Sequence, residues 1–154
     1  QLEPRASKSK IALINENLNG SGKILVVADY YRIYQVLKNL VTNAIKYSDP
    51  STSITVFIKK SKKVATIYVN DQGRGIAKNH RKRIFERFYR IEKSRSKERG
   101  GTGLGLAISK HIIEGHKTKI KLKSKVNSGS TFSFNLKLLP KKIKKRKRIA
   151  KTLN

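Results

Sequence analysis

The fold is decided by one stretch of the chain, YRIYQVLKNLVTNAIKY at residues 31–47. Its apolar residues recur with the spacing that gives a helix one core-facing stripe. The members of that stripe are Ile33, Val36, Leu37, Leu40, Val41, Ala44 and Ile45. Away from the stripe, Asn39 and Asn43 stand four residues apart, which places both amides on one helix face. Lys46 and Tyr47 close that face, so we expect a helix that packs on one side and holds a polar ligand on the other.

Two glycine-rich segments favour a ligand over plain solvent on that face. The first, DQGRGI at residues 71–76, follows an alternating strand pattern that puts Asp71 on the apolar side of its strand. Gly73 and Gly75 would let the backbone approach a ligand closely. The second segment, GTGLGL at residues 101–106, comes directly before an amphipathic helix. Its N–H groups and the positive end of the helix dipole predict a place for phosphates.

The remaining segments predict a mixed set of helices and strands. Alternating apolar and polar residues predict four strands, at 54–58, 65–69, 119–123 and 131–138. Short apolar runs at 11–14 and 24–27, separated by the sequence NGSG, predict two further strands joined by a turn. Asp29 stands where the N-cap of the long helix is expected.

The chain length of 154 residues predicts a single folded domain, which we place at residues 11–139. Residues 1–10 offer little to bury and predict a linker or disordered lead-in. The long polar connection at about 72–101 is typical of a lid over a binding site. Residues 140–154 predict a disordered basic tail, able to bind polyanions without specificity.

The charge balance is unusual, with 37 basic residues, 9 acidic residues and a net charge of +28. Such a surface attracts polyanions, but most of the lysines alternate with core residues, which is typical of a solvated surface. The absence of cysteine excludes disulfides, thiolate metal sites and a cysteine nucleophile. No apolar run is long enough to span a bilayer. We therefore expect a soluble, cytoplasmic domain.

The polar groups match the needs of a purine nucleotide with a magnesium ion. Asp71 can accept a hydrogen bond from the exocyclic amine of the base, while Asn39 and Asn43 can offer oxygens to Mg²⁺. Apolar walls for the ring would come from Ile76, Tyr47 and Leu104. N–H donors for the phosphates would come from the loop Gly101, Thr102, Gly103, Leu104 and Gly105. Balancing positive charge would come from Lys46, Arg90 and Arg95.

Four segments together resemble the ATP-binding catalytic domain of sensor histidine kinases, within the GHKL ATPase superfamily. Residues 35–47 are similar to the N box, 71–76 to the first glycine box, 84–90 to the F box and 101–108 to the second glycine box. The likeness runs from about residue 11 to residue 138. It implies an α+β fold of the Bergerat type, a two-layer sandwich with a mixed sheet covered by helices on one face.

The resemblance also implies roles for individual residues. Asn39 and Asn43 would hold Mg²⁺, and Asp71 would contact the adenine amine. Lys46 and Tyr47 would reach the phosphates and cover the base. Arg90 and Arg95 stand where the family places lid residues that approach the γ-phosphate. The implied activity is transfer of that phosphate to a histidine on a separate dimerisation hairpin, with a response regulator downstream and a parent protein that is often anchored in the inner membrane.

The phospho-accepting histidine of the family has no counterpart here, because His80, His111 and His116 all lack its sequence context. The sequence at residues 116–118, HKT, also stands where the family usually has His-Gly-Gly. We therefore expect the ATP-binding half alone, without its own acceptor.

Two other classes of function remain open at the level of sequence. The first is a GHKL ATPase or an anti-sigma serine kinase. Superfamily ATPases use a glutamate as general base in the N box, and Asn39 at that place cannot accept a proton at neutral pH, which disfavours hydrolysis. The second is a basic polyanion-binding module. No aromatic residues are interleaved with the basic runs for base stacking, so we expect no specific nucleic-acid partner.

Overall fold

The computed structural model describes residues 2–16, 23–91 and 102–140. Six strands form one mixed sheet with the order β1-β3-β4-β6-β2, and β5 pairs with β6 outside this path. The strands are β1 (Ala12–Asn15), β2 (Val26–Val27), β3 (Ser53–Lys60), β4 (Val64–Asp71), β5 (Lys121–Ser124) and β6 (Ser130–Leu138). The helices are α1 (Glu3–Lys8), α2 (Tyr30–Tyr47) and α3 (Gly105–Gly115), with the short 3₁₀ helices η1 (Lys78–His80) and η2 (Arg83–Phe85).

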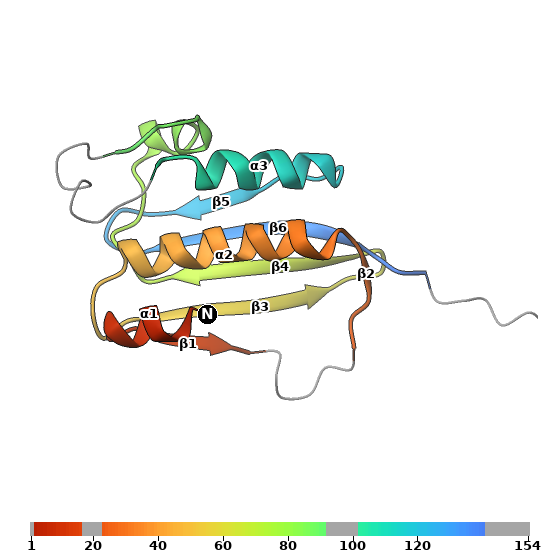
Figure 1. Ribbon diagram of the computed structural model, residues 1–154, viewed down its shortest axis with the longest axis horizontal. Coiled ribbons are helices and arrows are strands. Elements are labelled where there is room, and N and C mark those ends of the chain that lie inside the picture. The colour runs from red at the N-terminus through yellow and green to blue at the C-terminus, as the bar shows by residue number, and fades with distance from the viewer. Residues whose placement is uncertain (1, 17–22, 92–101, 141–154) are drawn as a thin grey trace, which may run out of the picture.

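The helices lie over one face of the sheet, with α2 in front of the central strands and α3 beside it (Figure 1). β1 runs parallel to β3, whereas β3, β4, β6, β5 and β2 pair antiparallel. The expected two-layer α+β sandwich with a mixed sheet is therefore confirmed. Because helices cover only one face, the strands alternate between buried and partly exposed residues.

The core forms where the apolar stripe of α2 meets the inner face of β4 and β6. The buried residues of α2 are Val36, Leu40, Val41, Ala44 and Ile45. They share one cluster with the inward-facing residues of the two strands, Ile67, Val69, Phe132, Phe134 and Leu136. Asp71 is the next inward position of β4 after Val69, so the strand pattern carries a carboxylate to the edge of the core.

The first residues of the chain differ from their expected role as a linker. Residues 3–8 form α1, in which Ala6 is buried and Leu2 packs against the core. The N–H of Ile11 donates to the carbonyl of Ala6 at 2.9 Å. Ala6 and Leu2 therefore anchor this helix to the core, while most of its other side chains remain in solvent.

The two N-terminal strands also differ from the expected pair joined by a turn. β1 pairs with β3, while β2 pairs with β6 at the opposite edge of the sheet. β2 is reduced to two residues. Their short apolar runs carry no information about partners, since strand pairing is decided by contacts distant in sequence.

The ends of the two long helices are linked through His116. Asp29 caps α2 as expected, and its carboxylate accepts from the N–H of Arg32 at 3.0 Å. The N–H of Asp29 donates to Nε2 of His116 at 3.1 Å. The other ring nitrogen of His116 contacts the carbonyl of Ile112 at 2.8 Å. Lys117 follows this cap residue with a left-handed φ of 59°.

Candidate nucleotide site

A cavity of about 260 Å³ opens between the C-terminal half of α2, the end of β4 and the start of α3. Its polar lining includes the expected residues Asn39, Asn43, Lys46, Tyr47, Asp71 and Arg90. Gly75, Ile76, Thr102, Gly103 and Gly105 also line it. Residues far apart in the sequence, from the N box, both glycine boxes and the F box region, therefore surround one space.

Asp71 is the acidic residue of this lining, and its placement is fixed by the backbone. Its side chain is 8% exposed, and Oδ1 accepts hydrogen bonds from the N–H of Gly73 at 2.9 Å and of Ser130 at 3.1 Å. Burial raises the pKa of the Asp71 carboxyl, and the two backbone hydrogen bonds oppose that rise. With Oδ1 held by the protein, Oδ2 is the oxygen left to accept from a ligand.

The loop after Asp71 packs closely against the end of α2 and against the turn between β5 and β6. A Cβ on Gly73 would lie 2.4 Å from the carbonyl oxygen of Tyr47, at the end of α2. Gly75 has a φ of 68°, and a Cβ there would lie 1.9 Å from the carbonyl oxygen of Lys125. These glycines are therefore required by close protein packing around the loop. Gly73 does not itself line the cavity, contrary to the idea that it opens the backbone to a ligand.

The end of β5 and the turn to β6 also form hydrogen bonds with this loop. Ser124 Oγ accepts from the N–H of Ile76 at 2.8 Å and lies 2.9 Å from Ser130 Oγ. The N–H of Asn127 donates to the carbonyl of Arg74 at 2.8 Å. The two strands that flank this turn were predicted, at 119–123 and 131–138, but without a part in the site, because these contacts join segments about fifty residues apart.

Asn39 connects the two helices that border the cavity. Its Nδ2 donates to the carbonyl of Gly105 at 3.1 Å and to Ser109 Oγ at 3.2 Å. Ser109 is fully buried and in turn donates to the carbonyl of Gly105 at 2.8 Å. These bonds hold the first turn of α3 against α2. Since they use the amide nitrogen, Oδ1 of Asn39 is the atom of this side chain suited to a cation.

Asn39 and Asn43 both line the cavity, so an oxygen-ligand pair for Mg²⁺ fits the residues present. Mg²⁺ is satisfied by few protein oxygens when phosphates and water complete its shell. Within the described ranges, no group of three or more His, Cys, Asp or Glu side chains could hold a metal. A metal here would therefore depend on the amides and on a phosphate ligand.

Positive charge gathers where α2 ends. Lys46 Nζ lies 5.2 Å from the ring centre of Tyr47, and the guanidinium of Arg74 lies 4.9 Å from the same ring. Both cations line the cavity with Tyr47. Arg74 was not among the expected site residues, although its place between two glycines of the first glycine box could have drawn attention to it.

Tyr89, Arg90 and Ile91 line the cavity together with Thr102 and Gly103. The N–H of Phe88 donates to the carbonyl of Gly103 at 3.1 Å, which joins these two segments. Two of the expected phosphate and lid residues, Arg95 and Gly101, lie outside the described residues, as does the part of the expected lid at 92–101.

Apolar walls come partly from residues that sequence analysis did not select. Leu104 is the N-cap residue of α3 and does not line the cavity, contrary to expectation. Leu106, two residues later, lines it instead, together with Ala44, Ile84 and Phe132. The helix begins at Gly105, and its direction relative to α2 decides which leucine faces the space.

Comparisons with known proteins point to one family. Residues 28–140 match the family described as histidine kinase-, DNA gyrase B-, and HSP90-like ATPases. The catalytic domain of the histidine kinase ThkA, solved without nucleotide, has a TM-score of 0.72 and 30% identity, covering 90% of this chain and 88% of that one. The chain belongs to the histidine-kinase catalytic domains.

Two further comparisons show how this catalytic domain relates to longer proteins. The sensor-like histidine kinase SenX3 of Mycolicibacterium smegmatis is 39% identical over 135 residues, which is 88% of this chain and 34% of SenX3. The sensor protein SrrB of Staphylococcus aureus is 37% identical over 123 residues, which is 80% of this chain and 21% of SrrB. The chain thus spans about a fifth to a third of the length of these relatives.

The family and fold implied by the sequence motifs are both confirmed, and with them the ATP-binding character of the catalytic domain. A full-length structure of ShkA in complex with AMPPNP has a TM-score of 0.74 and 25% identity, covering 91% of this chain and 28% of ShkA. In the described part of the chain, no helix is both long and apolar enough to cross a membrane.

Proposed function

We propose that this catalytic domain binds Mg–ATP and presents the γ-phosphate to a histidine on a separate dimerisation hairpin, as one step of two-component signalling. The observation that carries the proposal is the buried carboxylate of Asp71, oriented by two backbone N–H groups in a cavity that amides and cations also line. A buried carboxylate with one oxygen left for a ligand is suited to an amine donor such as that of adenine.

Other residues of the cavity lining are suited to the triphosphate. Lys46 and Arg90 line it, and Gly103 and Gly105 bring backbone near the start of α3. The partial positive charge of that helix end and the two cations favour anionic oxygens. Mg²⁺, when bound, would neutralise phosphate charge, with Asn39 and Asn43 as its protein ligands. Arg95 belongs to this proposal as a second cation near the γ-phosphate.

Transfer is favoured over hydrolysis by the chemistry of Asn39. Its amide nitrogen donates to Gly105 and Ser109, and an amide cannot take a proton from water at neutral pH. Among the described residues, Asp71 is the carboxylate that lines the cavity, and its exposed oxygen is assigned to the base. The phosphate acceptor would therefore come from another segment or chain.

That acceptor is proposed to be the histidine of the parent kinase, with a response regulator receiving the phosphate afterwards. The parent would be a sensor kinase, anchored in the inner membrane in the arrangement that the family implies. The basic tail after residue 140 would add non-specific, salt-sensitive binding of polyanions.

Calorimetric titration with AMPPNP and Mg²⁺ tests the nucleotide site. The native chain should bind, and Asp71→Asn should weaken binding by at least about tenfold, because one amine acceptor is replaced by a donor. Asp49→Asn is the matched control, since it makes the same change of atoms and charge at an exposed position. Enough salt to screen the surface lysines is needed. Equal binding by both variants would contradict the assignment of Asp71.

Incubation with γ-labelled ATP tests the reaction. The chain alone should release little inorganic phosphate and acquire no acid-labile label. Addition of the parent's dimerisation hairpin should transfer label to that hairpin. Rapid phosphate release by the chain alone, with no labelled hairpin, would assign ATP hydrolysis to the domain instead.

A further inference from the structure

Large apolar side chains gather where α2 begins and where β2 pairs with the end of β6. Tyr30 is 73% exposed and Tyr31 is 80% exposed. We call the whole group the tyrosine end; its members are Leu25, Val27, Tyr30, Tyr31, Tyr34 and Leu139, all of them exposed. α2 begins here, and its first residue that lines the cavity, Asn39, comes nine residues after Tyr30, about 13 Å along the helix. The tyrosine end is therefore separate from the nucleotide site.

The members of the tyrosine end are neighbours in the fold. The N–H of Leu139 donates to the carbonyl of Leu25 at 2.9 Å, where β2 pairs with the end of β6. Val27 leads through Asp29 into the first turn of α2. There, the rings of Tyr30 and Tyr31 meet edge to face at 5.3 Å, and Tyr30 stacks on Tyr34 at 6.4 Å. Aromatic contacts of this kind favour this arrangement of the rings.

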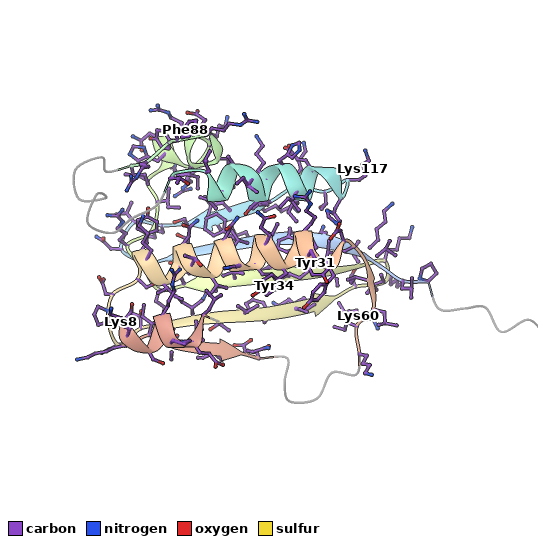
Figure 2. The ribbon with its side chains drawn as sticks, viewed as in Figure 1. Lys8, Tyr31, Tyr34, Lys60, Phe88 and Lys117 are labelled. Atoms are coloured by element: carbon purple, nitrogen blue, oxygen red, sulfur yellow. The ribbon has the colours of Figure 1, made fainter. Side chains whose placement is uncertain are left out.

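Basic residues surround this apolar group. The end of β3 exposes Lys59 and Lys60, and the turn to β4 exposes Lys62 and Lys63. This turn lies close to the end of β6, because the N–H of Leu138 donates to the carbonyl of Lys63 at 3.0 Å. Figure 2 shows Lys60 at the same end as Tyr31. Residues 23–34 and 59–63 contain one acidic residue, Asp29, and its carboxylate accepts from the N–H of Arg32.

The sequence that follows the tyrosine end along the chain is also basic. It begins two residues after Leu139, whose N–H donates to Leu25, and it carries eight Lys and Arg residues among the last fourteen without an acidic one. A strongly basic sequence therefore comes directly after the last member of the tyrosine end.

We propose that the tyrosine end binds the surface of an anionic lipid bilayer. Tyrosine has an apolar ring with a polar tip and suits the boundary between headgroups and acyl chains. The exposed Leu25, Val27 and Leu139 suit the apolar side of that boundary, and the basic residues suit anionic headgroups. A nucleic acid would match the charge but not the three aliphatic side chains, so the lipid surface is the better fit.

This assignment explains why α2 starts with exposed tyrosines while its second half follows an ordinary amphipathic pattern. A soluble surface has no need for aromatic side chains that are nearly fully exposed, and clustered exposure of this kind marks interaction surfaces. The binding would leave the cavity at the other end of α2 open to nucleotide.

Vesicle sedimentation with the full chain provides the test. Vesicles of phosphatidylcholine with phosphatidylserine should bind the native chain, and vesicles of phosphatidylcholine alone should not. The double variant Tyr30→Gln with Tyr31→Gln keeps the net charge and a good helix former at both positions. It should lose at least about tenfold in affinity for the anionic vesicles, because the apolar contribution is removed.

Val126→Gln is the matched control, since Val126 is 50% exposed in the turn between β5 and β6, away from the tyrosine end. It should bind anionic vesicles like the native chain. Circular dichroism and AMPPNP binding, both unchanged, would show that the double variant is folded. Equal vesicle binding by the double variant and the native chain would overturn the proposal, because charge alone would then explain it. Tighter binding of single-stranded DNA than of anionic vesicles, lost in the same double variant, would overturn it in favour of a nucleic-acid surface.

Discussion

At the scale of single residues, Asp71 shows how a strand pattern becomes a binding group. Alternation puts it on the inner side of β4, where the three preceding inward residues, Ala65, Ile67 and Val69, are apolar. A carboxylate at that depth needs donors, and the backbone of Gly73 and Ser130 provides them. The raised pKa of Asp71 shows that these bonds do not fully offset the cost of burial.

The pH dependence of stability follows from that pKa. A carboxyl whose pKa is raised by folding binds its proton more tightly in the folded chain than in the unfolded chain. The free energy of unfolding therefore falls as the pH rises from the pKa of the unfolded chain through the raised pKa of the folded chain. Asp71→Asn retains an oxygen for Gly73 and Ser130 but removes this cost. We expect the variant to gain stability relative to the native chain as pH rises to neutrality.

Urea unfolding at neutral pH and at several acidic pH values would measure this difference in the free energy of unfolding. Asp49→Asn, an exposed exchange of the same atoms, gives the reference series. A native chain that gained stability over Asp71→Asn with rising pH would show that the backbone hydrogen bonds outweigh burial.

At the scale of elements, the helix ends carry information that periodicity does not. α3 ends at Gly115, with His116 bonded to the carbonyl of Ile112 and to the N–H of Asp29 at the start of α2. The residue after this cap, Lys117, adopts a φ of 59°, a region that glycine enters without steric cost. The family's usual glycine at this turn is thus explained by the backbone, and lysine occupies the same conformation here.

Lys117→Gly should therefore stabilise the domain. A non-glycine residue in the left-handed region costs about 1–2 kcal/mol, while glycine adds about 0.4–1 kcal/mol of unfolded-state entropy. The expected net gain is about 0.5–1 kcal/mol in the free energy of unfolding, measured by urea titration. Lys119→Gly removes the same charge at a residue without positive φ and should destabilise the domain. Loss of stability in both variants would contradict a strain at Lys117.

At the scale of the whole molecule, the net charge of +28 is the dominant feature. Two of the ion pairs in the described part of the chain, Arg83–Glu86 at 3.7 Å and Lys110–Glu114 at 4.0 Å, lie on the surface, where such pairs contribute little. The 9 acidic residues cannot balance the 37 basic ones. Repulsion among the excess cations therefore opposes the compact state.

Added salt should raise the melting temperature. Screening of about 1 kcal/mol of repulsion corresponds to a rise of about 3 °C for a chain of this size. Thermal unfolding across a series of sodium chloride concentrations would measure the shift, with an uncharged osmolyte at matched osmolarity as the control. A melting temperature that stays constant or falls with salt would show that the lysines are spaced too widely to repel.

The sequence by itself determined the elements that depend on local pattern. The long helix, its cap at Asp29, four strands and the identity of the ATP-binding family all follow from periodicity and from four motifs. Those motifs name Asn39, Asn43, Asp71 and the second glycine loop, because chemistry at a nucleotide site restricts residue types at fixed spacing.

Tertiary structure alone decided the features that join distant segments. It placed β1 and β2 at opposite edges of the sheet and formed a helix from residues 3–8. In the cavity wall it placed Leu106 where Leu104 was expected, and Arg74 also lines the cavity. Ser109 and Ser124 hold neighbouring segments of the site by hydrogen bonds. It also brought Leu139 to the exposed tyrosines of α2. The physical reason is that strand pairing and side-chain contacts depend on free energies summed over the whole packed core, which no local spacing encodes.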